Sequence, residues 1–185
     1  SWTDELNDDK LTLRPEGTAG CVRAVIQGSL TYNGPVKLFY RGAMFRHENV
    51  QKGRQRQFHQ LGIESFGLTD PASDAEQIIM LSRLWKSLGL EKKIRLEINS
   101  IGDIDDREHY RKKLIDYFEK NIETLDDDAK RRLHKNPMRI LDSKNPHMQD
   151  MLEKAPKLID TINEDAKKHF KSLCQILKDN HVDFQ

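Results

Sequence analysis

Two segments in the first third of the chain combine apolar and polar side chains in the manner of β-strands. Val36 to His47 is rich in Val, Phe, Tyr and Met, and Gln57 to Phe66 shows a similar mixture. The residues between them, Glu48 to Arg56, are polar. The pattern predicts two strands joined by a basic, flexible loop.

Side chains alternate across a strand, which assigns the polar residues of both segments to faces. In the second segment, one face carries Phe58, Gln60, Gly62 and Glu64, and the other carries His59, Leu61, Ile63 and Ser65. The same count in the first segment aligns Tyr40, Gly42, Met44, Arg46 and Glu48. We therefore expect a cleft lined by Arg46, Gln60 and Glu64. The opposite face, with Leu61 and Ile63, suits packing on helices.

Helical patterns flank this predicted hairpin. The hexapeptide LRPEGT precedes an apolar helix running towards Leu30, which Thr18 is suited to cap, with Glu16 near its positive end. A capping box of Ser73 and Glu76 predicts a second helix, which Gly89 ends. For Glu16 and Thr18, a purely structural capping role is the alternative to a functional one.

The remainder of the chain is predicted to begin with one more strand and then to become helical. The strand covers Ile94 to Ser100, and charged residues dominate from Asp103 onwards. One buried helical stripe is expected there, formed by Ala166, Phe170, Leu173, Cys174 and Leu177. The part up to Gly102 carries a net charge of +2 and the part after it −1, so neither half is uniformly basic.

Positive charge is concentrated in the predicted hairpin. Residues 37–56 contain six Lys or Arg and one Glu, whereas the whole chain has a net charge of only +1. Arginine binds phosphate through two parallel charge-assisted hydrogen bonds, and it can offset charge that develops during phosphoryl or nucleotidyl transfer. The local excess indicates an anion site rather than a surface that coats nucleic acid. A solvated basic hairpin is the alternative.

Four segments in this order resemble the histidyl-tRNA synthetases, a family of class II aminoacyl-tRNA synthetases. They are LRPEGT, YRGAMFRHE, QKGRQRQFHQLGIE and LEINSIG, and the resemblance extends through essentially all 185 residues. It implies an α+β fold. Residues 1–102 would form part of the antiparallel class II catalytic domain, including its second signature motif, and residues 103–185 a mostly α-helical insertion domain.

The resemblance also implies roles for individual residues. Arg46 would be catalytic, holding the ATP α-phosphate and the attacking carboxylate. ATP would be bound by Arg46, Glu48, Arg54, Arg56 and Phe58, with adenine stacked on Phe58 and Arg54 at the terminal phosphates. Histidine would be bound by Glu16, Thr18, Gln60 and Glu64. The implied reaction forms histidyl-adenylate and pyrophosphate, with Mg²⁺ shielding the phosphates, and then transfers histidine to the 3′ end of tRNA(His).

Several family segments lie outside these residues: the first signature motif, the histidine-specific segment, the third signature motif and the anticodon-binding domain. We therefore expect an incomplete fragment that is inactive alone, from a parent enzyme that is a homodimer. Two alternatives are a histidine-sensing regulatory subunit of histidine biosynthesis and a non-catalytic tRNA-binding fragment.

In the helical part, phosphate contacts are suggested for Lys130, Arg131, Arg132, Lys135 and Arg139, although neighbouring acids also fit a solvated helix face.

Other features exclude several classes of protein. Cys21 and Cys174 lie far apart in apolar patterns, which favours buried thiols and a reducing cytoplasm. The sequence has no zinc-ligand cluster, HExxH, P-loop or GxGxxG motif, so no metal site is expected. There is no long apolar run, so a membrane location is not expected. His47 and His59 are expected to point away from the Arg46 and Gln60 faces.

Overall fold

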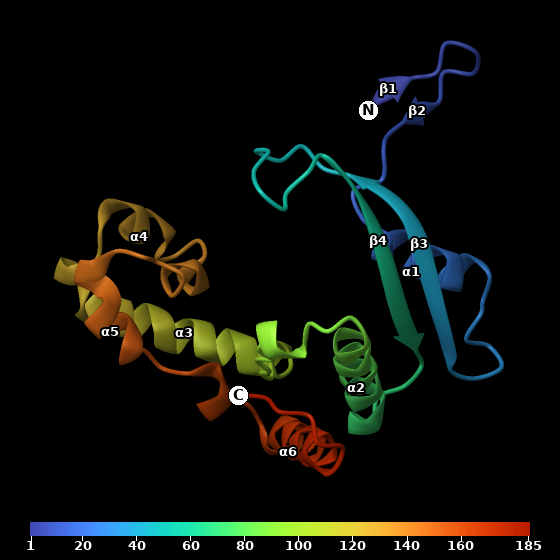
Figure 1. Ribbon diagram of the computed structural model, residues 1–185. Helices are drawn as coiled ribbons and strands as arrows, with labels where there is room; N and C mark the ends of the chain where they lie inside the picture. Colours follow the sequence, from blue (N-terminus) through green and yellow to red (C-terminus); the bar gives the residue numbers. More distant parts are fainter. The chain divides into compact units, whose positions relative to one another are not determined.

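The computed structural model describes residues 1–185, which form two compact units, Ser1–Thr69 and Asp70–Gln185 (Figure 1). Both helices and antiparallel strand pairs are present, which confirms the predicted α+β class. The first unit contains β1 (Trp2–Thr3), β2 (Lys10–Leu11), α1 (Thr18–Gln27), β3 (Val36–Phe45) and β4 (Gln57–Phe66). The two compact units meet after Thr69, whereas the domain boundary implied by the family resemblance follows Gly102. That domain boundary stays a prediction.

Strands β3 and β4 form the predicted antiparallel pair. Their register runs from Val36 opposite Phe66 to Phe45 opposite Gln57. Met44 therefore faces Phe58 across the pair, and the next two pairs on this face are Gly42 with Gln60 and Tyr40 with Gly62. The alternation predicted from the sequence is confirmed, because these cross-strand partners share a face.

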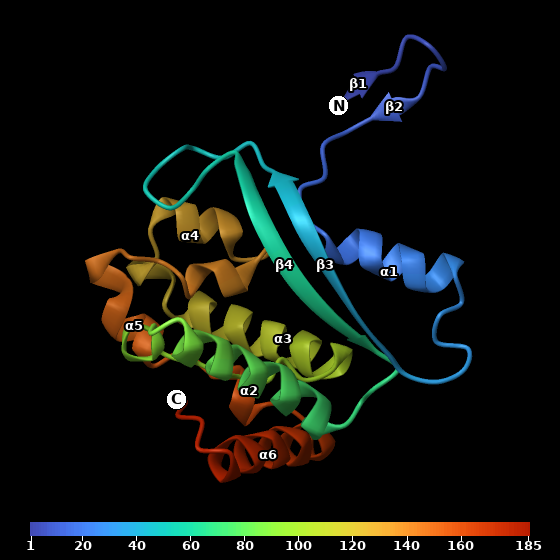
Figure 2. The ribbon, with the colours of Figure 1, turned by 45° about the vertical axis from the view of Figure 1, so that its right-hand side comes forward.

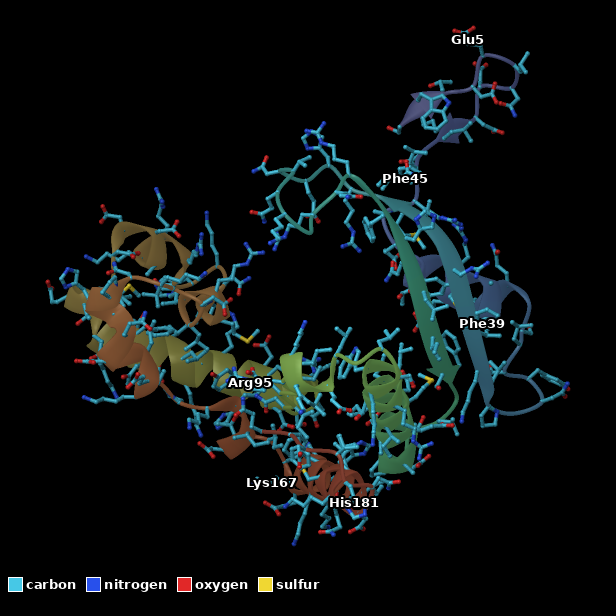
Figure 3. The ribbon with its side chains drawn as sticks, in the orientation of Figure 1. Glu5, Phe39, Phe45, Arg95, Lys167 and His181 are labelled. Carbon is cyan, nitrogen blue, oxygen red and sulfur yellow. The ribbon has the colours of Figure 1, made fainter.

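The two faces of this strand pair differ in how far other residues bury them. The loop before α1 lies against the face with Tyr40 and Gly42, and Met44 on that face is almost completely buried. On the opposite face, Leu61 is 57% exposed and Phe39, which Figure 3 labels, is 76% exposed. The expectation of helix packing is therefore wrong for Leu61, whereas Ile63 on the same face is half-buried.

The second unit is helical. Its α-helices are α2 (Pro71–Ser87), α3 (Ile104–Lys120), α4 (Asp127–Arg132), α5 (Gln149–Glu153) and α6 (Glu164–Asp179). Five 3-10 turns connect them: η1 (Glu91–Lys93), η2 (Ile122–Thr124), η3 (Pro137–Ile140), η4 (Pro146–Met148) and η5 (Leu158–Asp160). No helix is long and apolar enough to cross a membrane.

The strand expected at Ile94 to Ser100 does not form. The segment has no neighbouring strand, and its backbone bonds to another segment go only to Gln185. The Ile98 amide donates to the Gln185 carbonyl at 3.1 Å, and the Gln185 amide donates to the Leu96 carbonyl at 3.1 Å. A regular strand requires a ladder of such bonds, and a single partner residue does not supply one.

The predicted capping box of α2 is also wrong. Asp70, not Ser73, caps the helix, because its carboxylate accepts from the amides of Ala72 and Ser73. Pro71 occupies the first helical position, where its fixed φ and missing N–H are tolerated, so the helix begins before Ser73. The end of the helix is confirmed: α2 stops at Ser87, shortly before Gly89.

Two separate apolar clusters stabilise the second unit. One joins α3 with the segments up to α5, through Tyr110, Leu114, Phe118, Leu125, Ala129, Leu133, Ile140, Met148, Met151 and Ala155. The other joins α2 with α6 and with Val182, which follows α6. Its buried residues are Ala75, Leu173, Leu177 and Val182. Both views show α6 beside α2 (Figures 1 and 2). The predicted α6 stripe is confirmed at Phe170, Leu173 and Leu177.

Candidate functional site

Arg46 lies directly after β3, and three contacts orient it. Its amide donates to the Arg56 carbonyl at 2.9 Å, and its Nε donates to the Pro15 carbonyl at 2.8 Å. The guanidinium carbon lies 4.9 Å from the centre of the Phe58 ring, within cation–π range. The two terminal nitrogens are not used in these contacts, so an exposed, oriented fork remains for an anion.

The loop between the strands presents further arginines. Arg56 Nε donates to the Glu48 carbonyl at 3.4 Å, and a backbone bridge joins Gln51 with Arg54, whose amide donates to the Gln51 carbonyl at 2.9 Å. Arg54 and Arg56 are exposed, while Glu48 is half-buried. The structure therefore brings Arg46, Glu48, Arg56 and Phe58 together at the loop end of the hairpin. Arg54 lies farther out on the loop.

Gln60 and Glu64 occupy the same face of β4, further from the loop. The Gln60 Oε1 atom is buried and has no hydrogen-bond partner. Glu64 is half-buried. Leaving a buried acceptor unpaired costs about 1–3 kcal/mol, so this amide oxygen is suited to an N–H donor from a ligand.

Glu16, rather than Thr18, bonds to the first turn of α1. Both carboxylate oxygens of Glu16 accept from the Ala19 amide, at 3.0 and 3.2 Å, in the first turn of α1. Thr18 is the first residue of α1 and forms no capping bond, so its predicted capping role is wrong. Its hydroxyl instead lies 3.2 Å from the Tyr40 hydroxyl. Glu16 already satisfies the first-turn amide, which leaves the Thr18 hydroxyl available to the sheet.

Two residues absent from the sequence-based site connect its parts. Arg14 Nε donates to the Ala43 carbonyl at 2.8 Å, and its guanidinium lies against the Cα of Gly42. Tyr40 lies between Gly17 and Gly62. The available signal was the alternation itself, which places Tyr40 and Gly42 on the face of Gln60. His59 pairs with Ala43 on the other face, as alternation predicts, and both His47 and His59 are exposed.

A cavity of about 650 Å³ lies beside this site. The loop before α1, the helix itself and β3 line it, and Glu16, Cys21, Tyr40 and Met44 are among the lining residues. Gln60 and Glu64 do not line it, so the cavity and the face of β4 are neighbouring features. Gln60 and Glu64 share one face of β4, and the cavity lies on the side of the loop and β3.

Comparison with known proteins extends these observations. Residues 2–180 match the family described as tRNA synthetase class II core domain (G, H, P, S and T). The histidine–tRNA ligase of Methylobacillus flagellatus is 66% identical over 131 residues, which cover 71% of this chain and 31% of that protein. The histidine–tRNA ligase of Nitrosomonas eutropha is 56% identical over 131 residues, again 71% of this chain and 31% of that protein. The chain thus spans about a third of the length of these relatives.

A solved structure covers almost the whole chain. The crystal structure of apo S. aureus histidyl-tRNA synthetase matches with a TM-score of 0.73 and 36% identity, over 99% of this chain and 42% of that one. The antiparallel hairpin and the helices that follow it therefore recur in an enzyme of known fold.

Proposed function

Because the chain belongs to the class II tRNA synthetase core domain family, we propose that its protein is a histidine–tRNA ligase. Such an enzyme activates histidine with ATP, releases pyrophosphate and transfers histidine to the 3′ end of tRNA. The names of the relatives at 66% and 56% identity support histidine as the amino acid. The observation that carries the proposal is the single face of β3–β4 that presents Arg46, Phe58, Gln60 and Glu64.

ATP would bind at the loop end of this face. Adenine would stack on Phe58, and the Arg46 guanidinium, 4.9 Å from that ring, would reach the α-phosphate. Arg54 would contact the terminal phosphates, with Glu48 and Arg56 beside the nucleotide. Magnesium, carried on the phosphate oxygens, would offset their charge, because this ion is usually held by substrate phosphates and few protein groups.

Histidine would bind where Gln60 and Glu64 are. The substrate brings an ammonium group and a ring N–H, which suit the unpaired Gln60 oxygen and the Glu64 carboxylate. Glu16 and Thr18 would complete the pocket from the loop side. A site with unpaired acceptors discriminates strongly against amino acids that lack the matching donors, because those acceptors would stay unsatisfied.

The reaction would proceed without a covalent enzyme intermediate. The histidine carboxylate attacks the α-phosphorus of ATP, and pyrophosphate leaves. Arg46 would bind both the carboxylate and the α-phosphate, which holds them together and stabilises charge that grows in the transition state. Positioning and electrostatics would therefore supply most of the rate enhancement.

The helical segment after Asp103 would contact part of the tRNA. Arg131 and Arg132 both contact Asp128, at 3.0 and 2.6 Å, which offsets their charge. Lys130, Lys135 and Arg139 are exposed and are the better phosphate ligands of the group. A cytoplasmic homodimer is the expected setting of the enzyme.

Histidine-dependent exchange between pyrophosphate and ATP tests the activity directly, in the protein at full length. Exchange with histidine, and not with other amino acids, is the expected result. A histidine-sensing regulatory protein would instead bind histidine without exchange. That outcome would contradict the proposal.

Arg46→Ala tests the catalytic assignment. We expect the exchange rate to fall by roughly 10²–10³-fold, the usual effect of removing one transition-state donor, and the Kd for histidine to rise far less than that. Arg41→Ala is the matched control, because Arg41 lies on β3 shortly before Arg46 but pairs with Leu61 on the opposite face. Equal losses in exchange and in histidine binding would remove the transition-state role of Arg46.

A further inference from the structure

Tyr40 occupies the space between the loop before α1 and strand β4. A Cβ atom added at Gly17 would overlap the Tyr40 ring, and a Cβ added at Gly62 would overlap it from the other strand. Gly17 has a φ of −109°, and Gly62 is not among the positive-φ glycines. Space for the ring, rather than an unusual backbone conformation, is therefore the reason for glycine at both positions.

The hydroxyl group adds a polar contact to this packing. It lies 3.2 Å from the Thr18 hydroxyl, at the first residue of α1. The Tyr40 side chain is half-buried, so the contact is partly shielded from water. Tyr40 thus contacts the loop through Gly17 and Thr18, and the sheet through Gly62.

These contacts determine how the loop side of the site lies relative to β4. Gly62 lies between Gln60 and Glu64 on one face of the strand, and Gly17 lies between Glu16 and Thr18 in the loop. The Tyr40 ring therefore lies against the loop residue between Glu16 and Thr18 and against the strand residue between Gln60 and Glu64. A change in the ring or its hydroxyl would move one pair relative to the other without altering the pairs themselves.

We propose that Tyr40 is a positioning residue of the amino-acid site: its ring spaces the loop from β4, and its hydroxyl orients Thr18 towards the ligand. The inference rests on the proposed function for the identity of the ligand. Its contacts lie away from the nucleotide end of the site, because Phe58 pairs with Met44, four positions along β3 from Tyr40, and Arg46 follows the end of that strand. Arg46 reaches the same loop only at Pro15, before Glu16. We therefore expect the effect of Tyr40 to be larger on the amino acid than on the nucleotide.

Tyr40→Phe in the full-length protein keeps the ring and removes the hydroxyl. We expect the Kd for histidine, measured by calorimetry, to rise by roughly 3–10-fold, as for the loss of one hydrogen bond, with the Kd for ATP unchanged. Tyr32→Phe is the matched control, because Tyr32 is 88% exposed and makes none of these contacts. Equal rises for histidine and ATP would overturn the proposal.

Thr18 supplies the partner test. Thr18→Val removes the hydroxyl at constant shape, and Thr18→Ser retains it. The combination of Tyr40→Phe with Thr18→Val is expected to raise the histidine Kd by less than the product of the single effects, because both changes remove one shared contact. Thr18→Ser should restore most of the binding lost in Thr18→Val. Independent, multiplying effects would show that the two hydroxyls do not act together.

Hydrogen exchange in the ligand-free protein separates this inference from the proposed function. Tyr40→Phe is expected to speed exchange at the first turn of α1, where Thr18 lies, whether or not histidine is the ligand. If the wild-type protein fails to bind histidine, the proposed function fails and the exchange result still decides the role of Tyr40. Unchanged exchange in Tyr40→Phe would overturn that role.

Discussion

At the scale of single residues, Asp126 joins two segments of the helical unit. One carboxylate oxygen accepts from the Ala129 amide at 2.8 Å and caps α4, and the other accepts from the Asn145 side chain at 3.0 Å. The Asn145 hydrogen bond is the largest influence that lowers the pKa of Asp126 below its ordinary value, followed by the Ala129 amide. Both donors favour the charged carboxylate.

The lowered pKa of Asp126 predicts a dependence of stability on pH. The ionised carboxylate stabilises the folded state at pH values above the unfolded pKa, about 3.9 for Asp, and this contribution disappears as the pH falls through the lower folded value. In Asn145→Ala, the pKa of Asp126 should move back towards the ordinary value and the loss of stability on acidification should become smaller. Carboxyl NMR titration and thermal melts from pH 6 to pH 2 measure both.

Asp126→Asn is the control for that titration. It cannot ionise, so the part of the acid destabilisation that belongs to this position should be absent. If the pKa of Asp126 is the same in Asn145→Ala and in the unchanged protein, the Asn145 hydrogen bond has no role in the shift.

At the scale of elements, one asparagine connects the starts of two helices. Asn163 caps α6, because its Oδ1 accepts from the Ala166 amide at 2.8 Å. Its amide nitrogen donates to Asp103 at 2.7 Å and to Asp106 at 3.1 Å. Asp103 and Asp106 form the capping box of α3. The two helices therefore begin at a shared polar junction, although Asn163 follows Asp103 by 60 positions.

Asn163→Asp separates the cap from the junction. Aspartate caps as well as asparagine, but it places a third carboxylate against Asp103 and Asp106. We expect a loss of about 1–3 kcal/mol in the free energy of unfolding at pH 7, which shrinks towards pH 4 because a protonated carboxyl can donate again. Urea denaturation at both pH values measures the change.

Asn163→Ser is the matched control for Asn163→Asp. Serine keeps the cap and adds no charge. The free energy of unfolding should therefore fall less in Asn163→Ser, and this fall should not depend on pH between pH 7 and pH 4. A loss in Asn163→Asp that is the same at pH 7 and pH 4 would mean that repulsion at the junction is not its cause.

At the scale of the whole molecule, the helical unit is stabilised by two apolar clusters rather than one. Leu114 on α3 and Leu177 on α6 are both fully buried, but in different clusters. Two tyrosines reinforce the first cluster: Tyr110 donates to the Pro156 carbonyl at 2.8 Å, and Tyr117 donates to the Met151 carbonyl at 2.7 Å. We therefore expect the two clusters to loosen separately.

Leu114→Ala and Leu177→Ala form a matched pair for this expectation. Each should reduce the free energy of unfolding by about 2–5 kcal/mol, through lost transfer energy and a remaining cavity. In native-state hydrogen exchange, Leu114→Ala should speed exchange mainly in α3 to α5, and Leu177→Ala mainly in α2 and α6. Equal acceleration throughout the unit in both variants would show a single cooperative core.

The sequence by itself determined the local features of the site. Strand alternation correctly grouped Phe58, Gln60 and Glu64 with the face of Met44, since a period of two is a property of any extended chain. The buried stripe of α6 followed in the same way from helical spacing. These predictions succeed because they depend on residues that are near in sequence.

Only the tertiary structure decided which groups meet. It placed Tyr40 between Gly17 and Gly62, covered one face of β3–β4 while leaving Leu61 exposed, and left Ile94 to Ser100 without a strand partner. Each of these outcomes depends on contacts between segments distant in sequence. Local periodicity sets the conformation that a segment can adopt. The residues that bond to the segment and bury its side chains come from the rest of the fold.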